Sequence, residues 1–183
     1  MPKHNASGAT SILHGSGWAV ACALLAFSAL VLGVGASMSG DWVKVAAWLA
    51  CAAIGIAAII FRHTLPPFFG FLLTIAAMVN SAGYVFNLWH ERTMFDEVVH
   101  GFAFFAGTSS VGWFVLQQRP GVTGLFWKAA LAALVAGLAW EGFEWLIGII
   151  GDTRDTLIDL AMDMIGALGA AALLRKFVAK TAN

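Results

Sequence analysis

The 183-residue sequence has few charged side chains: Asp, Glu, Lys and Arg together make up only 11% of it. Hydrophobic residues account for 60%, which is well above the share in a soluble domain of this size. The net charge is zero and no basic run occurs, so the composition does not favour nucleic acid as a partner. The scarcity of charge therefore predicts an integral membrane protein.

Cysteine and the common catalytic motifs are also scarce. Cys22 and Cys51 stand singly in apolar segments, with no spacing that suits a disulfide or a thiolate metal site. The sequence contains no His-Glu-x-x-His motif, no glycine-rich phosphate loop and no ordering typical of a Ser-His-Asp triad. These absences argue against nucleotide binding and nucleophilic catalysis, and they leave the reaction unspecified.

Long apolar segments predict the fold, because each can cross a hydrocarbon core of about 30 Å as a helix. The predicted spans cover residues 18–37, 42–61, 67–88, 97–117, 127–149 and 157–177. The connections are short, so we expect an all-α polytopic membrane helix bundle of about six transmembrane helices, with residues 1–183 forming a single integral membrane domain. The first apolar run is longer than the core of a signal peptide, which predicts a retained first span.

The distribution of Lys and Arg predicts the orientation of the bundle. If the N-terminus is cytoplasmic, seven of these residues lie on the cytoplasmic side and three lie outside. The seven are Lys3, Arg62, Arg119, Lys128, Arg175, Lys176 and Lys180, and the three are Lys44, Arg92 and Arg154. We therefore expect both termini in the cytoplasm.

Acidic residues concentrate in the second half of the chain. All of them except Asp41 lie between Glu91 and Asp163. Residues 1–65 accordingly look like apolar scaffold helices, and residues 66–178 look like helices that carry a polar centre. An ionised side chain at the middle of a bilayer costs roughly 3 kcal/mol or more, so intramembrane acids indicate a functional site by default.

Helical spacing places these acids on one face of each of the last three predicted spans. The three faces carry Asp96 with His100, Glu141 with Glu144, and Asp159 with Asp163. Small residues accompany them, which allows membrane helices to approach closely. At 1.5 Å per residue the three faces reach a similar depth below the outward boundary. We therefore predict that they converge on one polar centre.

Several carboxylates around one imidazole repel one another unless they are protonated or hold a cation. Oxygen ligands with a single histidine suit one divalent ion such as Mg, Mn, Ca or Zn. A di-iron bundle needs Glu-x-x-His, whereas this sequence has Glu-x-x-Glu. The metal-ligand candidates are Asp96, His100, Glu141, Glu144, Asp159 and Asp163. Glu144 and Asp159 are also candidates for a catalytic general base.

Four further polar residues are candidates for substrate contacts: Tyr84, Asn87, Arg92 and Arg154. The first two follow the polar face of the third span, and the arginines are placed to bridge an anionic ligand to the acidic centre. The simpler interpretation makes Tyr84 and Asn87 interhelical hydrogen-bonding groups. It likewise makes the loop around Arg154 a solvated turn, with acids that cap the last helix.

Three segments carry a resemblance to a known family: FDEVVHGFAFF (95–105), WEGFEW (140–145) and DTLIDLAMDMIGALGA (155–170). They resemble the Asp-x-x-x-His, Glu-rich and Asp-x-x-x-(Asp/Asn)-x-x-Gly motifs of the YjdF-like proteins of the bacterial inner membrane. More distantly they resemble VanZ-like proteins, some of which are associated with teicoplanin resistance. The resemblance covers roughly residues 90–175. It implies an inner-membrane location and a shared polar centre, but no established reaction.

Three functions remain open from the sequence. One is a metal-assisted enzyme or binding protein that acts on a lipid-linked or amphipathic molecule from the outer leaflet. Another is a proton- or cation-coupled carrier in which the same acids titrate. The last is a non-catalytic accessory or scaffold subunit, within a membrane complex or a homo-oligomer, whose acids hold helices together. Membrane lipids are expected partners in every case.

Overall fold

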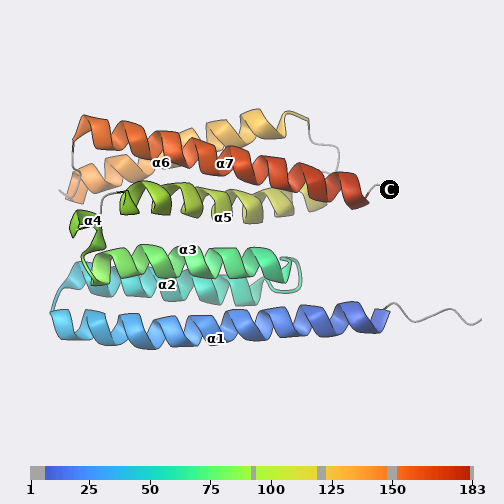
Figure 1. Ribbon diagram of the computed structural model, residues 1–183, viewed down its shortest axis with the longest axis horizontal. Coiled ribbons are helices and arrows are strands. Elements are labelled where there is room, and N and C mark those ends of the chain that lie inside the picture. The colour runs from blue at the N-terminus through green and yellow to red at the C-terminus, as the bar shows by residue number, and fades with distance from the viewer. Residues whose placement is uncertain (1–6, 92–93, 119–122, 148–151, 182–183) are drawn as a thin grey trace, which may run out of the picture. The chain divides into compact units, whose positions relative to one another are not determined.

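The computed structural model describes residues 7–91, 94–118, 123–147 and 152–181, which are almost entirely helical and contain no strand (Figure 1). The helices in chain order are α1 (Ser7–Ser39), α2 (Trp42–Ile60), α3 (Pro67–Val85), the single turn α4 (Leu88–Glu91), α5 (Phe95–Gln118), α6 (Leu125–Ile147) and α7 (Thr153–Thr181). The predicted all-α membrane fold is confirmed. The chain divides into two compact units, Met1–Phe86 and Asn87–Asn183, and each is described by itself.

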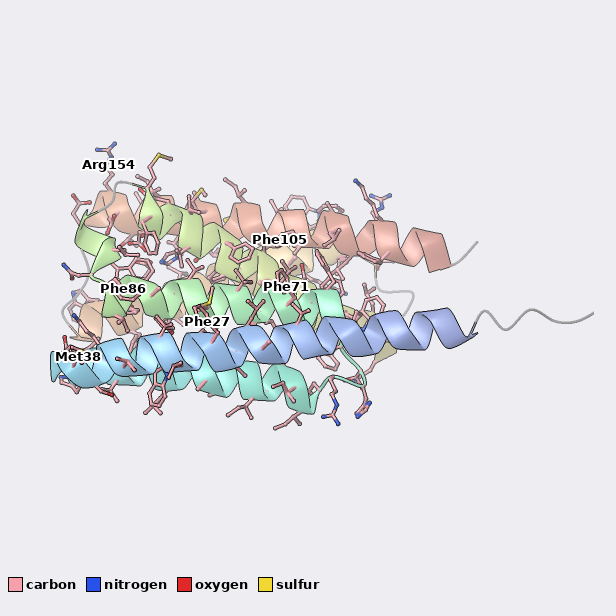
Figure 2. All side chains as sticks on the ribbon, turned by 60° about the horizontal axis from the view of Figure 1, so that its bottom comes forward. Phe27, Met38, Phe71, Phe86, Phe105 and Arg154 are labelled. Carbon is pink, nitrogen blue, oxygen red and sulfur yellow. The ribbon has the colours of Figure 1, made fainter. Side chains whose placement is uncertain are left out.

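Five of the described helices are long and apolar enough to cross a membrane, namely α2, α3, α5, α6 and α7. The apolar stretch Ala23–Ser39 of α1 is shorter. Large apolar side chains point outward from the helices, as Phe27 and Met38 do at 63% and 83% exposure (Figure 2). Such a surface is stable against lipid rather than water, so the protein is a multi-pass membrane protein.

In the first unit, α1, α2 and α3 pack against one another in all three pairs. Small polar side chains join them in the interior, where Ser28, Cys51 and Ser81 are buried. Ser81 on α3 donates a hydrogen bond to the carbonyl oxygen of Ala47 on α2 at 2.7 Å. Cys51 forms hydrogen bonds with Ser28 and Ser81. This apolar unit is therefore held together partly by interhelical hydrogen bonds, as is common between membrane helices.

In the second unit, α7 packs along both α5 and α6, whereas α5 and α6 contact each other little. Helices α5 and α7 run in the same direction and α6 runs in the opposite one (Figure 1). A Cβ added at Gly166 on α7 would overlap the carbonyl oxygen of Gly101 on α5 and lie 3.0 Å from the Phe105 nitrogen. The glycine at 166 thus permits direct backbone contact between α5 and α7, which sets their register.

Replacing Gly166 with alanine is expected to lower the free energy of unfolding by about 1–3 kcal/mol, because the new Cβ forces α5 and α7 apart. Gly142 on α6 is the matched control, since no neighbouring atom lies within 4 Å of a Cβ built there. Alanine at 142 should be neutral, or stabilising by up to about 1 kcal/mol through its helix propensity. Thermal unfolding of the full chain in detergent checks both variants, and equal melting temperatures would contradict the close packing.

Candidate metal centre

The polar centre of the second unit begins with four side chains on the two parallel helices. Asp96 and His100 are one turn apart at the start of α5, and Asp159 and Asp163 are one turn apart on α7. His100, Asp159 and Asp163 are buried, at 6%, 2% and 0% exposure. Asp96 is 29% exposed and lies at the edge of the cluster. The glycine contact described above holds α5 and α7 at the register that brings these residues together.

The two ring nitrogens of His100 face different carboxylates. Nδ1 lies 3.0 Å from Oδ1 of Asp163, a buried hydrogen bond between α5 and α7. Nε2 lies 3.4 Å from Oδ1 of Asp96. The second separation is longer than an ordinary N–H···O hydrogen bond of about 2.7–3.2 Å. Asp163 therefore fixes the orientation of the ring, while Nε2 points toward Asp96 without a close hydrogen bond.

Asp96, His100 and Asp159 form a group suited to a metal ion. Each offers one ligand atom, and the three atoms lie within 4.8 Å of one another. Ligands at about 2.0–2.2 Å from a tetrahedral ion stand roughly 3.4 Å apart, which is the separation of His100 Nε2 from Asp96 Oδ1. A metal-binding histidine usually donates its other ring N–H to a carboxylate, and Asp163 is that carboxylate here.

Helix α6 brings a third wall to the centre. A Cβ added at Gly137 would lie 2.5 Å from Oδ2 of Asp163, so this glycine lets α7 approach at the level of the cluster. Glu141, one turn further along α6, is buried and close enough to interact electrostatically with Asp96 and Asp159. Glu144 interacts with Asp96 and His100 in the same way, and it accepts a hydrogen bond from Trp140. Both glutamates therefore border the cluster.

Three carboxylate oxygens in the centre are buried and have no hydrogen-bond partner among the described residues. They are Oε1 of Glu141, Oδ1 of Asp159 and Oδ2 of Asp163. A buried carboxylate oxygen without a donor is costly, and the cost is relieved by a proton or a cation. The described part of the second unit offers no lysine or arginine within salt-bridge distance of these oxygens. These three oxygens therefore require protons or a bound cation as partners.

The structure describes three of the four predicted substrate-contact residues, and their contact with a substrate stays a prediction. Tyr84 belongs to the first unit, and Asn87 is exposed in a left-handed turn (φ 56°) after α3. Arg154 is exposed at the start of α7 and points away from the helices (Figure 2). Arg92 lies outside the described residues. The capping interpretation of the loop before α7 is confirmed, because Asp152 Oδ1 accepts hydrogen bonds from the nitrogens of Arg154 and Asp155 at 2.8 and 3.0 Å.

The sequence alone did not distinguish the roles of the two α7 carboxylates. Asp159 and Asp163 share a face and a chemistry, so their spacing predicts ligands of equal standing. The structure separates them: Asp159 joins Asp96 and His100 in the metal-sized group, and Asp163 holds the histidine ring from the other side. Gly137 lies on the same helical face as Glu141, so the sequence partly indicates that another helix packs closely against this face of α6.

An all-α multi-pass fold with an Asp–His cluster buried in its last three long helices defines a polytopic membrane protein with an intramembrane polar centre. The pattern of the family described as predicted membrane protein (DUF2238) matches residues 18–180, and the chain belongs to this family. It matches none of the curated proteins and none of the solved structures with which it was compared. The predicted YjdF-like resemblance fits this membership, and the VanZ-like resemblance stays a prediction.

Replacing Asp163 with alanine is expected to lower the free energy of unfolding by about 1–3 kcal/mol, because His100 Nδ1 is left buried without its partner. Asp163→Asn keeps a side-chain oxygen that accepts the same hydrogen bond, so it should retain most of the stability. Thermal unfolding of the full chain in detergent compares the two with wild type. Equal losses in the two variants would contradict a hydrogen-bonding role for Asp163.

Proposed function

We propose that the second unit holds one divalent metal ion inside the membrane, with Asp96, His100 and Asp159 as its ligands. The single observation that carries the proposal is the orientation of His100. Its Nδ1 is engaged by Asp163, and its Nε2 faces Asp96 at the spacing of two ligands on one ion. The orphaned oxygen of Asp159 adds support, because a buried carboxylate beside this pair requires a positive partner.

The donor set narrows the identity of the ion. Two carboxylates and one neutral imidazole suit borderline ions, since imidazole favours Zn and carboxylate favours Mn, Mg and Ca. Mg and Ca prefer sites built entirely from oxygen. Among the four predicted ions, Zn²⁺ and Mn²⁺ therefore fit this site best. The second unit offers no thiolate, because its sequence contains no cysteine.

Three protein ligands leave at least one coordination position for water or for a substrate oxygen. A bound ion of this kind acts as a Lewis acid and makes a coordinated water more acidic. Asp159 is a ligand in this proposal, so of the two predicted general bases Glu144 keeps the role, interacting electrostatically with Asp96 and His100 from α6. This assignment favours a metal-assisted enzyme or binding protein over a carrier.

The position of the centre limits which classes of molecule can reach it as a ligand. It lies in the first turns of two apolar spans, where a freely diffusing polar solute would have to enter from the membrane surface. A lipid-linked or amphipathic molecule reaches such a site directly from the bilayer. With both termini in the cytoplasm of a bacterial inner membrane, as the Lys and Arg count predicts, the centre faces the outer leaflet.

The second candidate is a purely structural centre, and a specific observation favours it as well. The His100–Asp163 hydrogen bond joins α5 to α7, and it would hold the helices together even without an ion. In that case the remaining acids carry protons, and the protein acts as an accessory or scaffold subunit of a membrane complex. The two candidates differ in whether a metal ion changes the stability of the folded protein.

Purified wild-type protein is expected to contain close to one Zn or Mn ion per chain by elemental mass spectrometry. Asp96→Asn, His100→Gln and Asp159→Asn should each remove most of it, because each deletes one ligand. Glu97→Gln is the matched control, since it neutralises the acid next to Asp96 but lies outside the metal-sized group. An ion content that is zero in wild type, even after Zn²⁺ or Mn²⁺ is supplied, would remove the proposal.

The same samples separate the metal centre from the structural one. A saturating ion at 100 times its dissociation constant should stabilise the wild type by about 2.7 kcal/mol and leave His100→Gln unchanged. No shift in wild type, together with a large loss of stability in Asp163→Ala, would assign the centre a structural role.

A further inference from the structure

The second unit also contains an apolar groove that is separate from the polar centre. It has a volume of about 520 Å³ and lies between α5 and α6, with α7 as its floor. Its walls are mostly small residues, such as Gly107 on α5 and Ala132 and Ala136 on α6. The hollow exists because α5 and α6 both pack on α7 and contact each other little. None of the six polar-centre residues lines it.

The dimensions of the groove match one hydrocarbon chain. On α5 its lining extends from Ala103 to Val115, a rise of roughly 18 Å at 1.5 Å per residue. One leaflet contributes about 15 Å to a 30 Å hydrocarbon core. The groove therefore runs alongside one leaflet, and Val111 and Val115 at its rim are exposed at 64% and 40%. Water is a poor occupant for such a surface, whereas an acyl chain suits it.

Charge distinguishes the two ends of the groove. Lys128, in the first turn of α6, is the one charged residue among those that line it. The acids of the unit lie toward the opposite end, on Asp96, Glu141 and Asp159. A cation at the mouth of an apolar groove between membrane helices is the arrangement that recognises an anionic lipid headgroup. A zwitterionic headgroup, whose choline offsets the charge of its phosphate, would gain less from Lys128.

We propose that this groove binds one molecule of an anionic phospholipid, with an acyl chain between α5 and α6 and the phosphate at Lys128. The site is distinct from the metal centre and does not depend on it. It assigns Lys128 the role of selecting the headgroup, and it assigns Gly107 and Ala132 the role of leaving room for the chain. By the Lys and Arg count, the lipid comes from the cytoplasmic leaflet, where anionic headgroups attract basic residues.

The test uses the full chain purified from vesicles that contain equal amounts of phosphatidylglycerol and phosphatidylcholine. Retained lipid is counted by native mass spectrometry. Wild type should keep about one phosphatidylglycerol per chain. Lys128→Gln should lower the preference for phosphatidylglycerol about fivefold, the effect of one interfacial cation. Lys176→Gln, which removes an exposed lysine on α7 outside the groove, should leave the preference unchanged.

A second pair of variants tests the groove itself. Ala132→Trp fills the groove and should abolish retention of the lipid. Leu131→Trp places the same side chain on the neighbouring residue, which is 63% exposed and does not line the groove, so retention should persist. Equal retention of the two lipids by wild type, an unchanged preference in Lys128→Gln, or lipid retention in Ala132→Trp would each overturn the proposal. So would a change in oligomeric mass in Ala132→Trp without loss of lipid, because the groove would then hold a second copy of the chain.

Metal content, measured on the same samples, keeps this proposal apart from the proposed function. Loss of lipid with one ion still bound supports the groove site independently. Parallel loss of lipid and metal in Ala132→Trp, accompanied by a lower melting temperature, would mean a misfolded variant. Gly107→Ala, a smaller obstruction in the same groove, then decides the matter: weakened lipid retention supports the site and unchanged retention overturns it.

Discussion

The second unit depends on one backbone contact, the approach of α5 to α7 at Gly101 and Gly166. No side chain intervenes at this point, so the two helices lie at a fixed distance and register. Both run in the same direction, so residues just before the contact on the two helices lie at similar depth. His100 precedes Gly101 and Asp163 lies one turn before Gly166, and these two side chains meet at 3.0 Å. A small-residue contact thus determines the geometry of a polar cluster, although it contributes no polar atom.

Much of this arrangement follows from the sequence. Helical period, span length and direction place Asp96, His100, Asp159 and Asp163 on facing stripes at one depth, because all of these depend only on counting residues. What counting does not provide is the rotation of each side chain. The structure, not the spacing, places Asp163 on Nδ1 of His100, Asp96 on the side of Nε2, and Asp159 in one group with Asp96 and His100.

Counting residues predicts the ends of helices, and the contacts between segments far apart in the sequence, less well. The third span was predicted to continue to residue 88, but α3 ends at Val85, and Asn87 adopts a left-handed conformation that an α-helix does not continue through. Hydropathy does not register this turn, because Phe86 and Leu88 on either side of it are apolar. Depth alone links Tyr84 and Asn87 to the centre, and this link stays a prediction.

The two units differ in how their buried polar groups find hydrogen-bond partners inside the membrane. In the first unit, the buried hydroxyl and thiol groups of α1, α2 and α3 form hydrogen bonds with one another and with the backbone. Few of the described buried polar groups there are therefore left without a partner. In the second, the carboxylates outnumber the available donors, and three buried oxygens are left without partners. Stability alone does not require this excess, since serine would join helices with less desolvation. The unsatisfied oxygens are the reason to assign a ligand to the second unit and none to the first.

The depth of His100 has an electrical consequence. It is five residues into the 24-residue helix α5, so it lies roughly one fifth of the way along that helix. Moving one elementary charge across the whole membrane is worth about 2.3 kcal/mol per 100 mV. An ion that reaches His100 from the nearer surface crosses only part of that field, and the two charges of a divalent ion double the effect. If the proposed ion enters from outside a membrane whose cytoplasmic side is negative, its occupancy of the centre would therefore depend on the membrane voltage.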